Sequence, residues 1–132
     1  MLGTPGSRLL IVDDEHQITT ALRDYFTVLG YVVDVAESEG AAHTLLDRLV
    51  YAAVITDLRL SEQRHDDGMD VIEHVRHRQP NAACVVMTSY GDAAYEIEAR
   101  RLGADAFLQK PTPLHLLAEQ LAEILKDRYQ NS

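Results

Sequence analysis

The chain alternates short apolar runs with longer segments of mixed polarity. The apolar runs lie at residues 9–12, 31–36, 52–56, 82–88 and 106–109. Most of them are continuous, which is typical of strands buried on both faces of a parallel sheet, whereas residues 31–36 alternate around Asp34 as a partly exposed strand would. The pattern predicts five strands.

Between these runs, apolar residues recur at helical spacing, as Ile18, Leu22 and Phe26 do after the first strand. Gly30 ends that helix, and Ser38 is placed to cap the next one. Three further helices are predicted at residues 69–78, 94–101 and 114–125. Strands that alternate with helices form a parallel sheet with helices on both faces, so the prediction is a doubly wound α/β fold.

The composition limits what the domain does. The chain has 132 residues, 46% of them hydrophobic, and a net charge of -9. The length fits one domain, predicted at residues 8–128 between a flexible N-terminal segment (1–7) and a C-terminal tail (129–132). The negative charge argues against direct nucleic acid binding. No basic signal-like start or long apolar stretch is present, so we expect a cytoplasmic protein without membrane contact.

Charged and hydroxyl side chains follow the predicted strands at the point where each strand ends. Asp13 and Asp14 follow the first strand, Asp57 the third, Thr88 ends the fourth and Lys110 follows the fifth. The carboxyl ends of parallel strands meet at one edge of a sheet, where such folds bind ligands. Three carboxylates and one amine gathered there could hold a divalent metal and a phosphoryl group.

These motifs resemble the receiver domain of bacterial two-component response regulators. The resemblance rests on Val12-Asp13-Asp14, Thr56-Asp57, Met87-Thr88-Ser89 and Gln109-Lys110-Pro111, and it covers roughly residues 8–125. It implies a flavodoxin-like (βα)5 three-layer sandwich with strand order 2-1-3-4-5. A lone Asp-Asp pair is usually a helix cap or a solvated turn, but the joint spacing of four motifs is far more specific.

The resemblance also implies a role for each residue. Asp57 is expected to be the phosphoacceptor. Asp14 and Asp57 would bind Mg²⁺ (or Mn²⁺) directly, Asp13 largely through a water, and Arg59 through its backbone carbonyl. Lys110 and Thr88 would contact the phosphoryl group, and Thr88 with Phe107 would form the conformational switch.

The same resemblance predicts partners and an output surface. The phosphoryl donor would be a sensor histidine kinase or a phosphotransfer protein. The last strand with residues 92–101 and 114–128 would form the output face, where phosphorylation could promote a homodimer. Glu96, Glu98, Arg100 and Arg101 could form cross-subunit ion pairs there, each weak. The domain would catalyse only its own phosphorylation and dephosphorylation, and the commonest output in the family is transcription through a separate or missing effector.

The sequence departs from the family pattern near the phosphoacceptor. Ser61 replaces the usual proline, and Gly68 comes about three residues late, so residues 62–67 lengthen the loop. Arg59 and Tyr90 are bulky residues that predict slow hydrolysis of the phosphoryl group, while Ser89 could narrow the approach to Asp57.

Two other functions remain as alternatives. An aspartyl-phosphate phosphatase would place a second aspartate where Arg59 stands, and a flavin-binding protein would need a Ser/Thr/Gly phosphate cradle after the first strand. The six histidines are scattered over helices and loops with no repeated ligand spacing, so we expect them at the surface rather than in a metal site. Metal binding through His65, Asp66 and Asp67 is an alternative, but adjacent polar residues in a long loop are more often solvated. Cys84 lies in an apolar run, so we do not expect a redox sensor.

Overall fold

The computed structural model describes residues 7–60, 67–89 and 91–130. In chain order the elements are β1 (Arg8–Val12), α1 (His16–Val28), β2 (Val32–Ala36), α2 (Glu39–Arg48), β3 (Ala53–Thr56), α3 (Asp67–Arg78), β4 (Ala83–Thr88), α4 (Ala93–Leu102), β5 (Ala106–Gln109) and α5 (Leu114–Gln130). The predicted alternation of strands and helices is confirmed.

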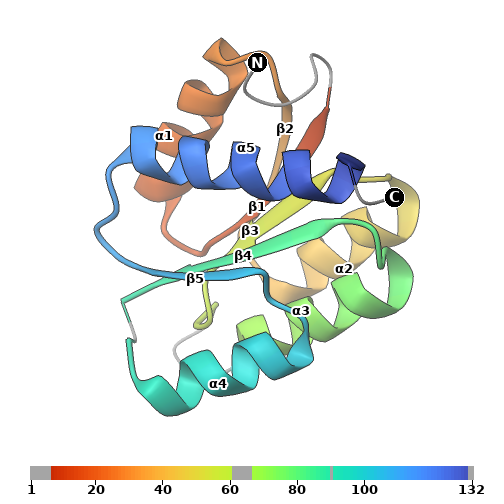
Figure 1. Cartoon of the computed structure of the whole chain (residues 1–132), viewed down its shortest axis with the longest axis vertical. Helices are drawn as coiled ribbons and strands as arrows, with labels where there is room; N and C mark the ends of the chain where they lie inside the picture. Colours follow the sequence, from red (N-terminus) through yellow and green to blue (C-terminus); the bar gives the residue numbers. More distant parts are fainter. Residues whose placement is uncertain (1–6, 61–66, 90, 131–132) are drawn as a thin grey trace.

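The five strands form one parallel sheet in the order β2-β1-β3-β4-β5, as predicted. Helices α1 and α5 cover one face, and α2, α3 and α4 cover the other (Figure 1). The order reverses between β1 and β3, which places the ends of these two strands beside each other at the ligand-binding edge.

Burial on both faces explains the continuous apolar runs. In β1, Leu10 and Val12 belong to the core beneath α2, α3 and α4, whereas Leu9 and Ile11 belong to the core beneath α1 and α5. All four are fully buried. Successive side chains of a strand point to opposite faces, so a strand packed on both sides needs an apolar residue at every position.

Most helix ends follow the predicted signals. The Ser38 hydroxyl accepts a hydrogen bond from the Ala41 amide at 3.1 Å, and Gly30 follows α1 with a φ of 102°. Two helix boundaries differ from the prediction by two residues or more: α3 begins at Asp67, two residues early, and α5 continues to Gln130, into the predicted tail. The early start of α3 has a tertiary cause, because Asp67 and Gly68 form hydrogen bonds with Leu60 and Leu58, which follow β3.

Two polar clusters hold the fold together away from the strand ends. Arg128 binds both carboxylate oxygens of Asp105 at 2.7 and 2.8 Å, and Asp105 accepts the Cys84 amide at 2.8 Å. The rings of His43 and His74 stack between α2 and α3, with centroids 4.0 Å apart, although the sequence analysis expected the histidines to be scattered surface residues.

Among the described helices, none is long and apolar enough to cross a membrane.

Candidate functional site

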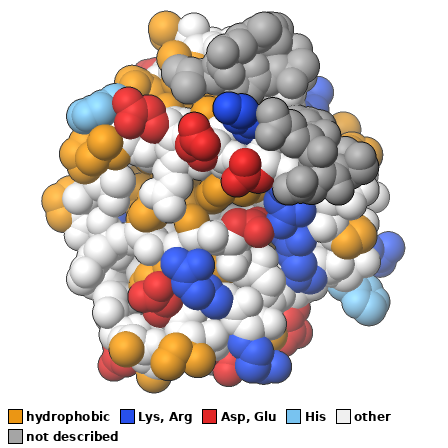
Figure 2. All heavy atoms as spheres, viewed as in Figure 1, with side chains coloured by type: hydrophobic (Ala, Val, Ile, Leu, Met, Phe, Trp, Pro, Cys, Tyr) orange, Lys and Arg blue, Asp and Glu red, His pale blue; other side chains and the backbone are white. Residues whose placement is uncertain are grey.

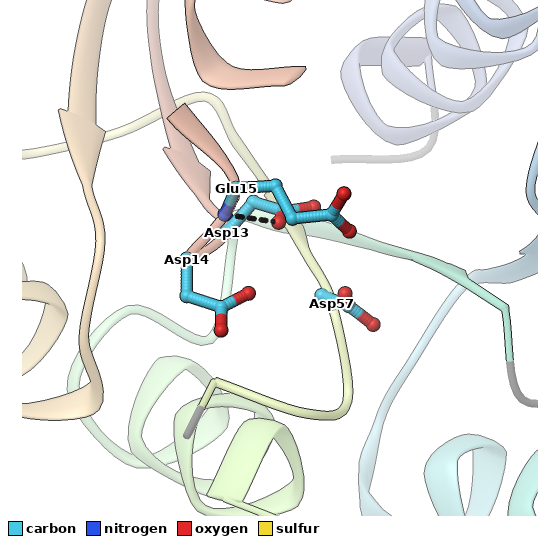
Figure 3. A group of neighbouring side chains, drawn as sticks. All are labelled: Asp13, Asp14, Glu15 and Asp57. Atoms are coloured by element: carbon cyan, nitrogen blue, oxygen red, sulfur yellow. Dashed lines mark hydrogen bonds between the residues drawn. The ribbon is translucent and has the colours of Figure 1, made fainter. Parts of the chain in front are cut away.

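The loops that follow β1 and β3 bring four carboxylates together. Asp13, Asp14, Glu15 and Asp57 each place one oxygen within 4.8 Å of the others (Figure 3). Asp13 is 2% exposed and Asp57 7%, whereas Asp14 and Glu15 are exposed. The site therefore combines two buried carboxylates with two that are exposed to solvent.

Lys110, which directly follows strand β5, is the positively charged residue of this cluster. Its Nζ lies 2.7 Å from Asp13 Oδ2, 2.9 Å from Asp57 Oδ2 and 3.4 Å from Glu15 Oε1. The Lys110 side chain is 8% exposed. One ammonium faces four carboxylates, so the site keeps an excess of negative charge.

Burial and neighbouring charges together shift the pKa values of three groups in this cluster. Burial raises the pKa of Asp13, and the hydrogen bond from Lys110 offsets only part of the rise. Asp14 is exposed, but the partial loss of solvent around its carboxylate, together with the charges of Asp57 and Glu15, raises its pKa. For Lys110, burial alone would lower the pKa, but the bonds and charges of Asp13 and Asp57 outweigh it and the pKa is raised. A further cation would therefore be stabilised here.

The backbone holds Asp57 in place from several directions. Its amide donates to the Val12 carbonyl at 2.9 Å, which joins the ends of β3 and β1. Its Oδ1 accepts the Leu58 amide at 2.7 Å and lies 3.5 Å from the Arg59 amide nitrogen. Because Oδ1 faces the backbone and Oδ2 faces Lys110, both carboxylate oxygens have fixed directions.

The predicted switch residues lie in two neighbouring strands, Thr88 at the end of β4 and Phe107 within β5. Thr88 is fully buried at the end of β4, and its carbonyl accepts the Lys110 amide at 2.8 Å. Phe107 in β5 is partly buried against the core beneath α2, α3 and α4. Thr88 is thus joined through the backbone to the residue that binds Asp57.

Sequence reasoning missed two acidic residues at this site. Glu15 directly follows the predicted pair, so a third consecutive acid was a visible signal. Asp67 was assigned to the loop as a solvated residue, yet it is 3% exposed and its Oδ1 accepts the Leu60 amide at 2.6 Å. Residues 61–66 and Tyr90 lie outside the described residues.

The sequence matches the family described as "Response regulator receiver domain" over residues 9–122. The chain belongs to the response regulator receiver family. Among curated relatives, this receiver is 34% identical to the photosynthetic apparatus regulatory protein RegA of Rhodobacter capsulatus over 83% of its own length and 58% of that protein. It is 36% identical to the alginate biosynthesis transcriptional regulatory protein AlgB of Pseudomonas putida over 79% of its length and 22% of that protein. The receiver thus spans about half the length of RegA and much less of AlgB.

Solved receivers share the fold. A CheY-like receiver of Methanospirillum hungatei superposes with a TM-score of 0.90 at 22% identity, covering 96% of this chain and 99% of that one. A Burkholderia pseudomallei response regulator with a phosphorylated aspartic acid, a calcium ion and citrate gives 0.82 at 25% identity, covering 93% and 72%. The beryllofluoride-activated NtrC4 receiver dimer gives 0.77 at 26% identity, covering 89% and 98%.

Proposed function

We propose that this receiver accepts a phosphoryl group on Asp57 from a phosphohistidine of a cytoplasmic sensor kinase or phosphotransfer protein. The observation that carries the proposal is the contact of Lys110 Nζ with both Asp57 and Asp13, inside a cluster of four carboxylates at the sheet's ligand-binding edge. The phosphorylated aspartate of the Burkholderia pseudomallei relative supports the same chemistry.

In the proposed reaction a carboxylate oxygen of Asp57 attacks phosphorus. A new O–P bond forms while the P–N bond to the donor histidine breaks, and the bonding electrons stay on the imidazole nitrogen, which is then protonated from solvent. The hydrogen bond from the Leu58 amide to Asp57 Oδ1 keeps the carboxylate oriented for in-line attack. Lys110 supplies positive charge where the transferred oxygens arrive.

The residues present fit a divalent cation of the Mg²⁺ type. Four carboxylates gather around the single ammonium of Lys110, and hard carboxylate oxygens are the ligands that Mg²⁺ prefers. Asp14, Asp57 and the Arg59 carbonyl would hold the ion directly, and Asp13 through a water; Mn²⁺ could substitute. When bound, the ion would neutralise charge on the phosphoryl oxygens.

Intact-mass analysis after incubation with acetyl phosphate and Mg²⁺ tests this proposal. The wild-type protein should gain one phosphoryl group, and both Asp57→Asn and a chelator should prevent the gain. An adduct that persists in Asp57→Asn would contradict the assignment of the acceptor. Asp24→Asn, which changes an exposed carboxylate on α1, is the matched control and should be phosphorylated normally.

The output proposal uses Thr88 and Phe107. The Thr88 hydroxyl would bond the new phosphoryl group and draw its loop inward, and Phe107 would follow it, changing the surface of α4, β5 and α5. A Thr88→Ala variant should still be phosphorylated but should lose the spectral changes in that surface when followed by NMR. Spectral changes equal to those of the wild type would remove Thr88 from the switch.

The face formed by α4, β5 and α5 is also the proposed dimer surface. Ile97 is 69% exposed and Leu116 47%, and the NtrC4 relative forms an activated receiver dimer. The acidic and basic residues expected to pair across subunits instead pair within α4: Glu96 with Arg100 at 3.0 Å, and Glu98 with Arg101. The visible face shows acidic, basic and hydrophobic side chains interspersed rather than one large apolar patch (Figure 2). We therefore expect a weak dimer in the absence of phosphorylation.

Sedimentation with and without beryllofluoride tests the dimer, and Ile97→Lys should lower the association of the activated form.

A transcriptional output, through a partner or a further module, is supported by the name of the AlgB relative. Family membership favours these proposals over the phosphatase and flavin alternatives.

A further inference from the structure

Asp67 is a buried carboxylate that the phosphoryl-transfer proposal does not use. It is 3% exposed, and its Oδ1 accepts the backbone amide of Leu60 at 2.6 Å. A hydrogen bond from an amide to an ionised carboxylate is shorter and stronger than one to a neutral acceptor. The bond joins the start of α3 to the chain three residues after the phosphoacceptor.

Gly68 makes a second connection to the same segment. Its amide donates to the Leu58 carbonyl at 2.8 Å. A Cβ at Gly68 would lie 2.0 Å from the Asp57 carbonyl oxygen and 2.5 Å from Leu58 Cα, so no other residue allows this approach. Leu58 and Leu60 are therefore tied to two consecutive residues of α3, and Arg59 lies between them.

The geometry of the peptide group gives the Asp67 bond a consequence for Arg59. The Leu60 N–H and the Arg59 carbonyl belong to the same planar amide, and the only cis peptide among the described residues is Lys110-Pro111. In a trans amide the N–H and C=O point in opposite directions. Fixing the Leu60 N–H on Asp67 therefore directs the Arg59 carbonyl away from Asp67.

We propose that Asp67 is a positioning residue for the divalent-cation site, because it orients the peptide group whose carbonyl, that of Arg59, contributes to the site. The inference rests on the proposed function, in which that carbonyl is a metal ligand.

The test compares Mg²⁺ affinity by titration calorimetry in three variants. Asp67→Ala removes the acceptor and should weaken Mg²⁺ binding about 10- to 100-fold, as the loss of partners behind metal ligands generally does. Asp67→Asn removes the charge but keeps an acceptor oxygen, so it should retain most of the affinity. Asp70→Ala removes the same charge from the same first turn of α3 and should bind like the wild type.

A second measurement needs no metal. In the metal-free protein, the Leu60 amide proton should resonate downfield and exchange slowly in the wild type and in Asp67→Asn, and should lose both properties in Asp67→Ala. If Asp67→Ala does not fold, Asp67→Glu takes its place, because it keeps the charge but displaces the acceptor, and it should also weaken Mg²⁺ binding.

The outcomes separate the inference from the proposed function. Wild-type affinity in Asp67→Ala or Asp67→Glu would overturn the positioning role. Equal weakening in Asp67→Asn and Asp67→Ala would also overturn it, because the charge rather than the hydrogen bond would then matter. A wild-type protein that does not bind Mg²⁺ would overturn the metal site itself and this inference with it.

Discussion

Replacing Lys110 with methionine should destabilise the receiver strongly in the absence of metal. Lys110 Nζ lies 2.7 Å from Asp13 and 2.9 Å from Asp57, and all three side chains are 8% exposed or less. The substitution keeps most of the side-chain volume but leaves two buried carboxylates without their cation. They would then repel each other in a poorly solvated site.

The magnitude follows from these distances. At an effective dielectric constant of about 20, each contact is worth about 6 kcal/mol before the desolvation of the three groups is counted. Removing one partner of a buried ion pair costs about 3 to 5 kcal/mol net, and that is the expected loss in the free energy of unfolding. For a domain of this size the loss corresponds to a decrease in melting temperature of roughly 10 to 20 °C.

Urea unfolding in the presence of a chelator measures this loss. Lys126→Met is the matched control, because Lys126 is exposed on α5, and it should change the free energy of unfolding by less than about 0.5 kcal/mol. Adding Asp13→Asn to Lys110→Met should recover part of the loss, since one of the unpaired charges is removed. A loss below about 1 kcal/mol in Lys110→Met, or no recovery in the double variant, would refute this account of the buried charges.

Three further predictions concern the rest of the fold. Asp105→Asn should lose about 1.5 to 3 kcal/mol in urea unfolding, because the charged bonds to Arg128 are weakened; an equal loss in the exposed Asp127→Asn would contradict this. The Cys84 thiol should resist a disulfide reagent in the native protein and react in urea, since burial raises its pKa to about 12. Rapid reaction of Cys84 in the native protein would show that the core around it opens. Burial and the charge of His74 lower the pKa of His43 in the folded protein below its unfolded value of 6.5. The stability that neutral His43 contributes is therefore complete above pH 6.5, and it is lost as the pH falls through the folded pKa and the ring becomes protonated. His43→Gln should therefore flatten the decline in unfolding free energy between about pH 7.5 and pH 5, and an unchanged decline would assign it to other groups.

The pattern of apolar and polar residues was sufficient to predict the parallel fold and the main residues of the candidate site. The continuous apolar run of β1 required burial on both faces, and the alternation of strands with helices required right-handed crossovers. In such a sheet the ends of the strands share one edge, so Asp13, Asp57 and Lys110 could be grouped from their positions after the strands. Their roles in phosphorylation stay a prediction from the family resemblance.

Contacts between distant segments became visible only in the folded chain. The sequence placed Asp67 in a polar loop, because its burial depends on Leu60 and on the approach of Gly68 to the Asp57 backbone. The stacking of His43 on His74 likewise requires α2 and α3 to lie side by side. Local patterns report the face that a residue presents and the element that contains it, whereas the partner of a polar group is fixed only when the elements pack.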